Sequence, residues 1–197
     1  MMKVSVSNMR IILASSSPRR QELMKEMNLP FEVIVKPVDE RFNGNNNIYE
    51  QSMEISKRKA KAVFDEIEDD VIVIGSDTIV LQDGVIYGKP KDYNDAVNML
   101  KTFSNNRHEV LSSLCLLVRK NGQIYEEKTY DKCDVYVDEL SIDEIDEWIN
   151  SNDVYSKAGA YAIQEGFGKY IKKIDGDYFS IVGFPIHKLY NLLKKYI

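Results

Sequence analysis

The stretch Leu13-Ala14-Ser15-Ser16-Ser17-Pro18-Arg19-Arg20 joins a short apolar segment to the start of a helix through small hydroxyl residues. Ser17 is a favourable N-cap and Pro18 fits the first helical turn, so a helix is predicted to begin there. That turn presents unpaired backbone N–H groups and a partial positive charge, which together favour a bound phosphate. Arg19 and Arg20 place positive charge at the partially positive end of the helix, which is unfavourable unless a bound anion neutralises them. The stretch therefore indicates either a phosphate-binding junction or an ordinary junction with two solvated arginines.

On the C-terminal side of this junction, short apolar runs alternate with segments whose apolar residues recur at helical spacing. This pattern indicates an α/β protein with a mixed sheet flanked by helices. The turn sequences Asp83-Gly84 and Asn121-Gly122 predict β-hairpins, so the chain is expected to be richer in strands after Asp77. Ser141 to Glu144 has the pattern of a helix capping box. The expected strands are 10–14, 31–35, 71–75, 110–119 and 124–137, and the expected helices are 18–27, 49–67, 93–102, 141–150 and 185–196.

Length and composition limit the class of protein. The 197 residues fit one domain, 1–197, in which residues 1–9 are expected to be a flexible extension. A net charge of −5 argues against nucleic acid or a membrane surface as the main partner. No apolar run approaches the roughly 20 residues that span a bilayer. Only two cysteines are present, Cys115 and Cys133, and no secretory leader is recognisable, so we expect a cytoplasmic protein.

Two carboxylates are candidates for chemistry. The β-branched run 71–74 predicts a strand buried on both faces that delivers Asp77 at its carboxyl end, where ligands bind in open α/β sheets. Asp77 there can orient a water or bind a metal, which we favour over a turn or cap. Glu40 follows the preceding strand and could share a divalent ion with Asp77, or be a solvated loop acid. Hard oxygen ligands and a phosphate substrate favour magnesium or manganese.

Other polar residues are candidates for binding. Lys89, between Gly88 and Pro90, is a rigidly mounted cation suited to phosphate, although such turns are common. Gln164 lies in a segment rich in glycine and alanine and can read the edge of a nucleobase. The expected second helix carries four cations, of which one could face the site: Lys57, Arg58, Lys59 and Lys61.

Two further features are less informative. The polar run Asn43-Gly44-Asn45-Asn46-Asn47 predicts a mobile loop or lid, or plain variable surface. His108 and His187 lack metal-ligand spacing, so we assign them no catalytic role.

The ordered set of short motifs resembles the Maf-type nucleoside triphosphate pyrophosphatases, also called septum formation inhibitor proteins. The resemblance implies a strongly twisted mixed sheet with a β-rich second lobe, similar to the inosine triphosphatases, with the site in the cleft between lobes. The motifs are Leu13-Ala14-Ser15, Ser17-Pro18-Arg19-Arg20, Glu40, Lys59-Ala60, Gly75-Ser76-Asp77-Thr78, Gly88-Lys89-Pro90, Lys157-Ala158-Gly159-Ala160-Tyr161, Ile163-Gln164, Asp175-Gly176-Asp177-Tyr178 and Gly183-Phe184-Pro185-Ile186.

The resemblance also implies an activity and roles for single residues. The activity is hydrolysis of a nucleoside triphosphate between the α and β phosphates, with a divalent metal and in a homodimer. The Ser-Pro-Arg-Arg form resembles the branch that acts on dTTP and UTP, whereas a sister branch that acts on 7-methyl-GTP differs at the position of Arg19. The implied roles are proton acceptor for Asp77, phosphate binding for Ser15, Arg20, Lys59 and Lys89, metal binding for Glu40 and Asp77, and base specificity for Arg19, Thr78 and Gln164.

The sequence departs from the family pattern in two places: the asparagine-rich loop after Arg41, and Ile55-Ser56, where a more apolar pair is usual. Two alternatives to the enzyme remain, a partner-binding protein that inhibits septum formation and a module that binds nucleotides without hydrolysing them. The combination of Asp77, Lys59 and Lys89 favours catalysis over both.

Overall fold

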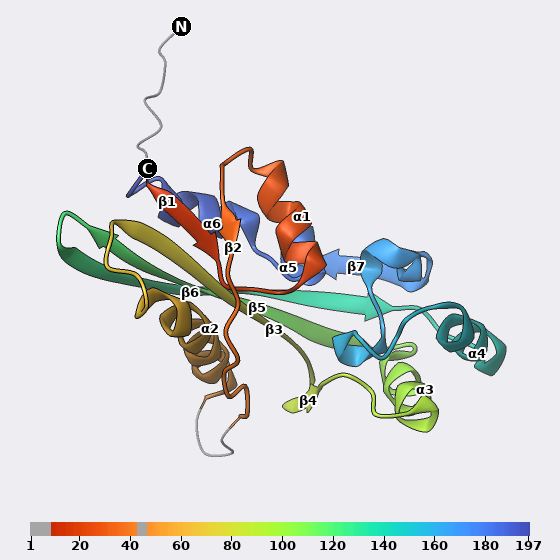
Figure 1. The fold of residues 1–197 in the computed structure, drawn as a ribbon. Helices are drawn as coiled ribbons and strands as arrows, with labels where there is room; N and C mark the ends of the chain where they lie inside the picture. The colour runs from red at the N-terminus through yellow and green to blue at the C-terminus, as the bar shows by residue number, and fades with distance from the viewer. Residues whose placement is uncertain (1–8, 43–46) are drawn as a thin grey trace, which may run out of the picture. The chain divides into compact units, whose positions relative to one another are not determined.

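The computed structural model describes residues 9–42 and 47–197, which form an α/β fold with a seven-stranded mixed sheet (Figure 1). The expected extension at residues 1–9 and the expected loop or lid at 43–47 lie outside these ranges except for Met9 and Asn47. Asn47 is the N-cap of a helix, and its side chain accepts a hydrogen bond from the Tyr49 amide.

The elements follow the expected alternation of strands and helices. In chain order they are β1 (Arg10–Leu13), α1 (Pro18–Glu26), β2 (Glu32–Val33), α2 (Ile48–Phe64), β3 (Val71–Gln82), β4 (Val85–Tyr87), α3 (Tyr93–Phe103), β5 (Arg107–Lys120), β6 (Gln123–Val137), α4 (Ile142–Ser151), the 3-10 helices η1 (Ala158–Ala160), η2 (Ile163–Glu165) and η3 (Phe167–Tyr170), β7 (Ile171–Asp175), α5 (Tyr178–Val182) and α6 (Ile186–Leu193).

The sheet has the strand order β2-β1-β3-β5-β6-β7, and β4 pairs with β3. β1 pairs in parallel with β2 and β3, whereas β4 and β7 pair antiparallel with β3 and β6. The expected mixed sheet is therefore confirmed. Both hairpin turns are also as expected, because Asp83-Gly84 and Asn121-Gly122 have the positive φ angles that a type I′ turn requires.

The described chain divides into two compact units. The first combines the described part of residues 1–77 with Ser113–Tyr130 and Gly183–Ile197, and the second combines Thr78–Ser112 with Asp131–Val182. β3, β5 and β6 contribute residues to both units. The assignment of residues 1–197 to one domain stays a prediction.

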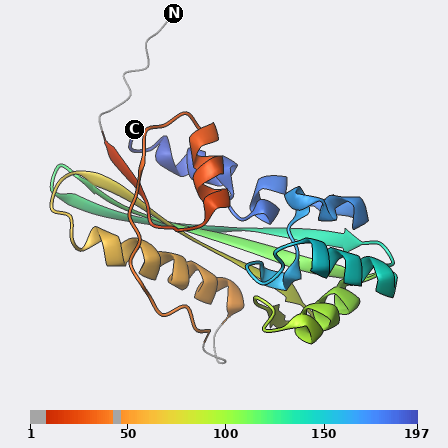
Figure 2. The same cartoon turned by 45° about the vertical axis from the view of Figure 1, so that its right-hand side comes forward.

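In the first unit, α2 covers one face of the sheet and α1 and α6 cover the other (Figures 1 and 2). The face toward α2 holds a buried cluster of Ile12, Val71 and Val73 with Ala60 and Val63 of the helix. α2 and β3 come very close at Gly75, where an added Cβ would lie 2.0 Å from the carbonyl oxygen of Ser56. Only a residue without a Cβ fits at this contact.

The second unit has its own core, built from α3, α4, the 3-10 helices and one face of its strands. Phe103, Trp148 and Phe167 are among its buried members. The capping box of α4 is present as expected, since the hydroxyl of Ser141 accepts from the Glu144 amide and the Glu144 carboxylate accepts from the Ser141 amide.

One expected boundary is wrong in a way that affects the site. β3 continues to Gln82 instead of ending at Gly75, because Val80 and its neighbours stay extended and pair with β4. Asp77 therefore lies inside a strand rather than after its end. The parallel pairing with β1 stops at Ile74, so Asp77 still lies just beyond that pairing.

Smaller differences concern short elements. β2 has two residues rather than the five of 31–35, and α6 ends at Leu193 rather than at residue 196. β7, α5 and the 3-10 helices were not expected.

Candidate functional site

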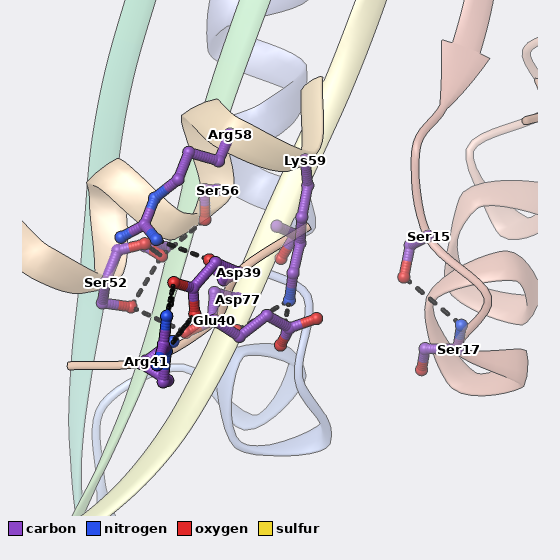
Figure 3. A network of polar contacts seen from close by, with 12 residues as sticks. Ser15, Ser17, Asp39, Glu40, Arg41, Ser52, Ser56, Arg58, Lys59 and Asp77 are labelled. Atoms are coloured by element: carbon purple, nitrogen blue, oxygen red, sulfur yellow. Dashed lines mark hydrogen bonds and ion pairs between the residues drawn. The ribbon is translucent and has the colours of Figure 1, made fainter. Parts of the chain in front are cut away.

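The strand-to-helix junction has the predicted caps. β1 ends at Leu13, Pro18 starts α1, and the hydroxyl of Ser17 accepts a hydrogen bond from the amide of Arg20 at 3.5 Å. The buried hydroxyl of Ser15 accepts from the Ser17 amide at 3.3 Å (Figure 3). The junction is thus a tight turn whose hydroxyls are already oriented by backbone donors.

Arg20 is half-buried and makes hydrogen bonds within the first unit, so it is not a freely solvated arginine. Its Nη1 donates to Ser15 Oγ at 3.2 Å and to the Ser76 carbonyl at 3.0 Å, and its Nε donates to the Gly183 carbonyl at 2.9 Å. Burial lowers the pKa of Arg20 from its usual value, while the nearby carboxylate of Asp77 opposes that shift. Arg19, in the same turn, is half-buried.

Lys59 lies between the two candidate carboxylates. Its Nζ is 2.9 Å from Asp77 Oδ1 and 2.9 Å from Glu40 Oε2 (Figure 3). The side chains of Lys59 and Asp77 are only 14% and 9% exposed, whereas that of Glu40 is 58% exposed. The cluster is therefore buried at Asp77 and open at Glu40.

Lys59 is the cation of the second helix that turns toward the candidate acids. The three other cations pair elsewhere: Lys57 with Glu126, Lys61 with Asp65, and Arg58 with the backbone carbonyl of Asp39.

A row of buried serines lies on the other side of Asp77, and sequence reasoning did not find it. The hydroxyl of Ser52 donates to Asp77 Oδ2 at 3.4 Å. Ser113 of β5 is 2.8 Å from Ser52 and 2.7 Å from Ser56, measured between hydroxyl oxygens (Ser52 and Ser56 are labelled in Figure 3). Both oxygens of the Asp77 carboxylate thus have donors.

The second unit carries the three other candidate residues. Thr78 Oγ1 lies 2.9 Å from Ser112 Oγ, and Ser112 donates to the Ser180 carbonyl at 2.7 Å. Lys89 lines a hollow of about 370 Å³ together with Tyr87 of β4, Asn98 of α3 and Lys91, which lies between these elements. Gln164 is exposed in η2.

The nine candidate residues therefore divide between the units. Within the first unit, Glu40, Lys59 and Asp77 form one cluster, and Arg20 joins Ser15 to the backbone of the residue before Asp77. Thr78, Lys89 and Gln164 belong to the second unit. The expectation of a site in a cleft between two lobes stays a prediction.

A metal ion would have to use few protein ligands. Within residues 9–42 and 47–197, no group of three or more His, Cys, Asp and Glu side chains is arranged to hold one. The two carboxylates that share the Lys59 ammonium nevertheless fit a hard divalent cation, because magnesium is commonly held by one or two carboxylates together with substrate phosphates and water. The donor set is thus compatible with Mg²⁺ or Mn²⁺ when substrate is present.

Comparison with known proteins shows the family of this chain. The family model "Maf-like protein" matches residues 10–196. This chain belongs to the Maf-like family. The dTTP/UTP pyrophosphatase of Clostridium novyi (strain NT) is 42% identical and covers 93% of this chain and 96% of its own length. The dTTP/UTP pyrophosphatase of Christiangramia forsetii is 37% identical, with coverage of 99% and 98%.

A solved structure, that of the Staphylococcus aureus Ham1 protein, overlaps 65% of this Maf-like chain and 71% of its own, with a TM-score of 0.43 and 14% identity.

In the part of the chain that the structure describes, no helix is both long and apolar enough to cross a membrane.

Proposed function

We propose that this Maf-like protein hydrolyses dTTP and UTP to the nucleoside monophosphate and pyrophosphate. The observation that carries the proposal is the half-open cluster in which Lys59 joins Asp77 and Glu40, in the same unit as the half-buried, hydrogen-bonded Arg20. A base and several cations near each other are what attack on a polyphosphate needs. The names of relatives about 40% identical over nearly the whole chain support the choice of substrate.

In the proposed reaction, Asp77 accepts a proton from a water whose oxygen attacks the α phosphorus. The bond between that phosphorus and the oxygen that bridges it to the β phosphate breaks, and pyrophosphate leaves with the electron pair. Arg20 and Lys59 offset the negative charge of the phosphates, and the hydroxyl of Ser15 donates to a phosphate oxygen. Lys89 is proposed as a further phosphate ligand.

We propose Mg²⁺ or Mn²⁺ as the cofactor, held by Glu40 and Asp77. When bound, such an ion neutralises phosphate charge and acidifies water. The test is titration of the substrate-bound protein with Mn²⁺, followed by electron paramagnetic resonance. Glu40→Gln should weaken Mn²⁺ binding, while Glu54→Gln on the outer face of α2 should not.

Base specificity is proposed to rest on Arg19, Thr78 and Gln164. The decisive variant is Arg19→Trp, assayed against a panel of triphosphates. Loss of dTTP and UTP hydrolysis with gain of another substrate supports the assignment, and an unchanged profile refutes it.

The experiment that tests the activity is the same panel with the purified wild type and a divalent metal, scored for pyrophosphate. Asp77→Asn should lower turnover by about 10²- to 10⁴-fold, the usual contribution of a positioned general base. Asp65→Asn is the matched control, because Asp65 also pairs with a lysine of α2 but is half exposed. Orthophosphate release would indicate a phosphatase, and saturable binding without product would favour the nucleotide-binding alternative.

We also propose that the protein acts in the cytoplasm as a homodimer, with neither nucleic acid nor membrane as its partner. The net charge of −5 supports the last point. The test of the assembly is sedimentation velocity with and without nucleotide. To test the septum-inhibitor alternative, Asp77→Asn is expressed in cells, where an unchanged division phenotype would favour a role that is independent of turnover.

A further inference from the structure

A line of three hydroxyl groups leads to the carboxylate of Asp77. The steps are 2.7 Å from Ser56 to Ser113, 2.8 Å from Ser113 to Ser52, and 3.4 Å from Ser52 to Asp77 Oδ2. Ser52, Ser56 and Ser113 are each 0% exposed. Hydroxyls that bulk water does not reach have to satisfy one another and the groups they face.

The number of hydrogens restricts the direction of these bonds. Each serine has one hydroxyl hydrogen, and an ionised carboxylate can only accept. If Ser52 donates to Asp77, then the contact between Ser52 and Ser113 needs the hydrogen of Ser113. The contact between Ser113 and Ser56 then needs the hydrogen of Ser56. A single orientation therefore supplies a hydrogen to all three contacts.

Every other orientation gives up at least one of these three contacts, and one of them uses a backbone carbonyl. Ser113 can instead donate to the backbone carbonyl of Ser52, which lies 2.9 Å from its hydroxyl oxygen. That carbonyl is inside α2, where helical geometry already gives it the backbone amide four residues on as a donor. With Ser52 still donating to Asp77, this choice would leave two hydroxyl oxygens 2.8 Å apart without a hydrogen between them. In a buried site such an arrangement is unfavourable.

We propose that Ser56, Ser113 and Ser52 form a one-way chain of hydrogen bonds that ends on Asp77 and fixes the orientation of its carboxylate. Ser52 holds Oδ2 and Lys59 holds Oδ1, and both come from the same face of α2. The proposal rests on the proposed role of Asp77 as the base. The three serines are positioning residues, because none of them needs to touch substrate.

Kinetics give the first test. Ser52→Ala should lower kcat for dTTP by about tenfold or more, the usual effect of one hydrogen bond to a charged group. KM should change by less than about twofold, because the cations that bind phosphate are intact. Ser113→Ala should also lower kcat, but not further in a protein that already carries Ser52→Ala, since the chain is then cut at its last link.

The control is Ser104→Ala in α3's C-cap, whose hydroxyl accepts from the Leu140 amide at 2.8 Å. It loses a hydrogen bond of similar length and should keep wild-type kcat. If Ser52→Ala and Ser113→Ala also keep wild-type kcat in an active enzyme, the positioning role is overturned while the proposed activity stands.

Neutron diffraction from a deuterated crystal gives a test that needs no activity. The proposal expects deuterium on Ser56 directed at Ser113, on Ser113 directed at Ser52 Oγ, and on Ser52 directed at Asp77. Deuterium of Ser113 on the Ser52 carbonyl would overturn it. If the wild type fails to hydrolyse any triphosphate but the deuterium positions are as expected, the function proposal fails and the hydrogen-bond chain stands.

Discussion

Replacing Lys59 by methionine tests how much the central ion pair contributes, because the change keeps most of the apolar stem and removes the charge. The side chains of Lys59 and Asp77 are 14% and 9% exposed. Removing one partner of a buried pair typically costs about 3–5 kcal/mol, since the other charge stays buried without a counter-ion. Glu40 is exposed and Ser52 still donates to Asp77, so we expect the lower end, about 3 kcal/mol.

The matched control is Lys61→Met, on the same helix and in the same kind of pair. The side chains of Lys61 and Asp65 are 56% and 54% exposed, so their pair should contribute no more than about 0.5 kcal/mol. In urea unfolding with a slope of about 2 kcal/mol/M, Lys59→Met should lower the midpoint by about 1.5 M and Lys61→Met by about 0.25 M or less.

Activity measured on the same samples separates two roles of Lys59. If it also binds phosphate, KM for dTTP rises and kcat falls in Lys59→Met, while Lys61→Met is unchanged. Equal midpoints for the two variants would refute the burial argument. A destabilised Lys59→Met that keeps the wild-type kcat and KM would make the lysine purely structural.

Three further predictions concern the fold. Gly75→Ala should lower the free energy of unfolding, measured in urea, by about 3 kcal/mol or more, because the new Cβ would lie 2.0 Å from the Ser56 carbonyl oxygen. Gly88→Ala is the control and should have less effect, because nothing lies within 4 Å of the added Cβ. Burial lowers the pKa of His108 from 6.5 to about 3. As the pH falls, the unfolded state therefore binds the proton before the folded state does. The free energy of unfolding should fall by about 1.4 kcal/mol for each pH unit below pH 6.5. His108→Phe should lose that slope, and a slope equal to the wild type's would contradict the assignment. Burial also raises the pKa of Cys115 to about 12, so iodoacetamide at pH 8 should label it only in urea, and rapid labelling of the folded protein would show that the thiol is accessible.

The sequence predicted those parts of the site that depend on neighbours along the chain. Ser17 and Pro18 give the start of α1 because capping is a matter of a few adjacent residues. The residues of the second helix alone leave the choice among its four cations open, and the family resemblance points to Lys59. The helical period also favours Lys59. The buried residues of α2 include Ser52, Ser56 and Ala60, and Lys59 falls on that same stripe.

Other parts could not be predicted, because they depend on contacts between distant segments. The length of β3 depends on the pairing of its second half with β4. Residues 71–75 by themselves carry no sign of that pairing. Ser113 meets Ser52 and Ser56 only because β5 lies under α2 in the folded sheet. A serine inside an apolar strand carries no local sign of such a partner.

Gly75 connects the packing of the fold to the chemistry proposed for the site. Alternate residues of a strand face the same side, so Gly75 and Asp77 both point toward α2. The missing Cβ lets the helix backbone approach β3 at Ser56, and Ser52 and Lys59, one turn away in either direction, then reach the two oxygens of Asp77. If a methyl group at position 75 pushed the helix away from β3, the contacts of Ser52 and Lys59 with Asp77 would both lengthen. The stability of the α2–β3 contact and the orientation of the proposed base therefore depend on the same glycine, and Gly75→Ala should lower kcat as well as unfolding free energy.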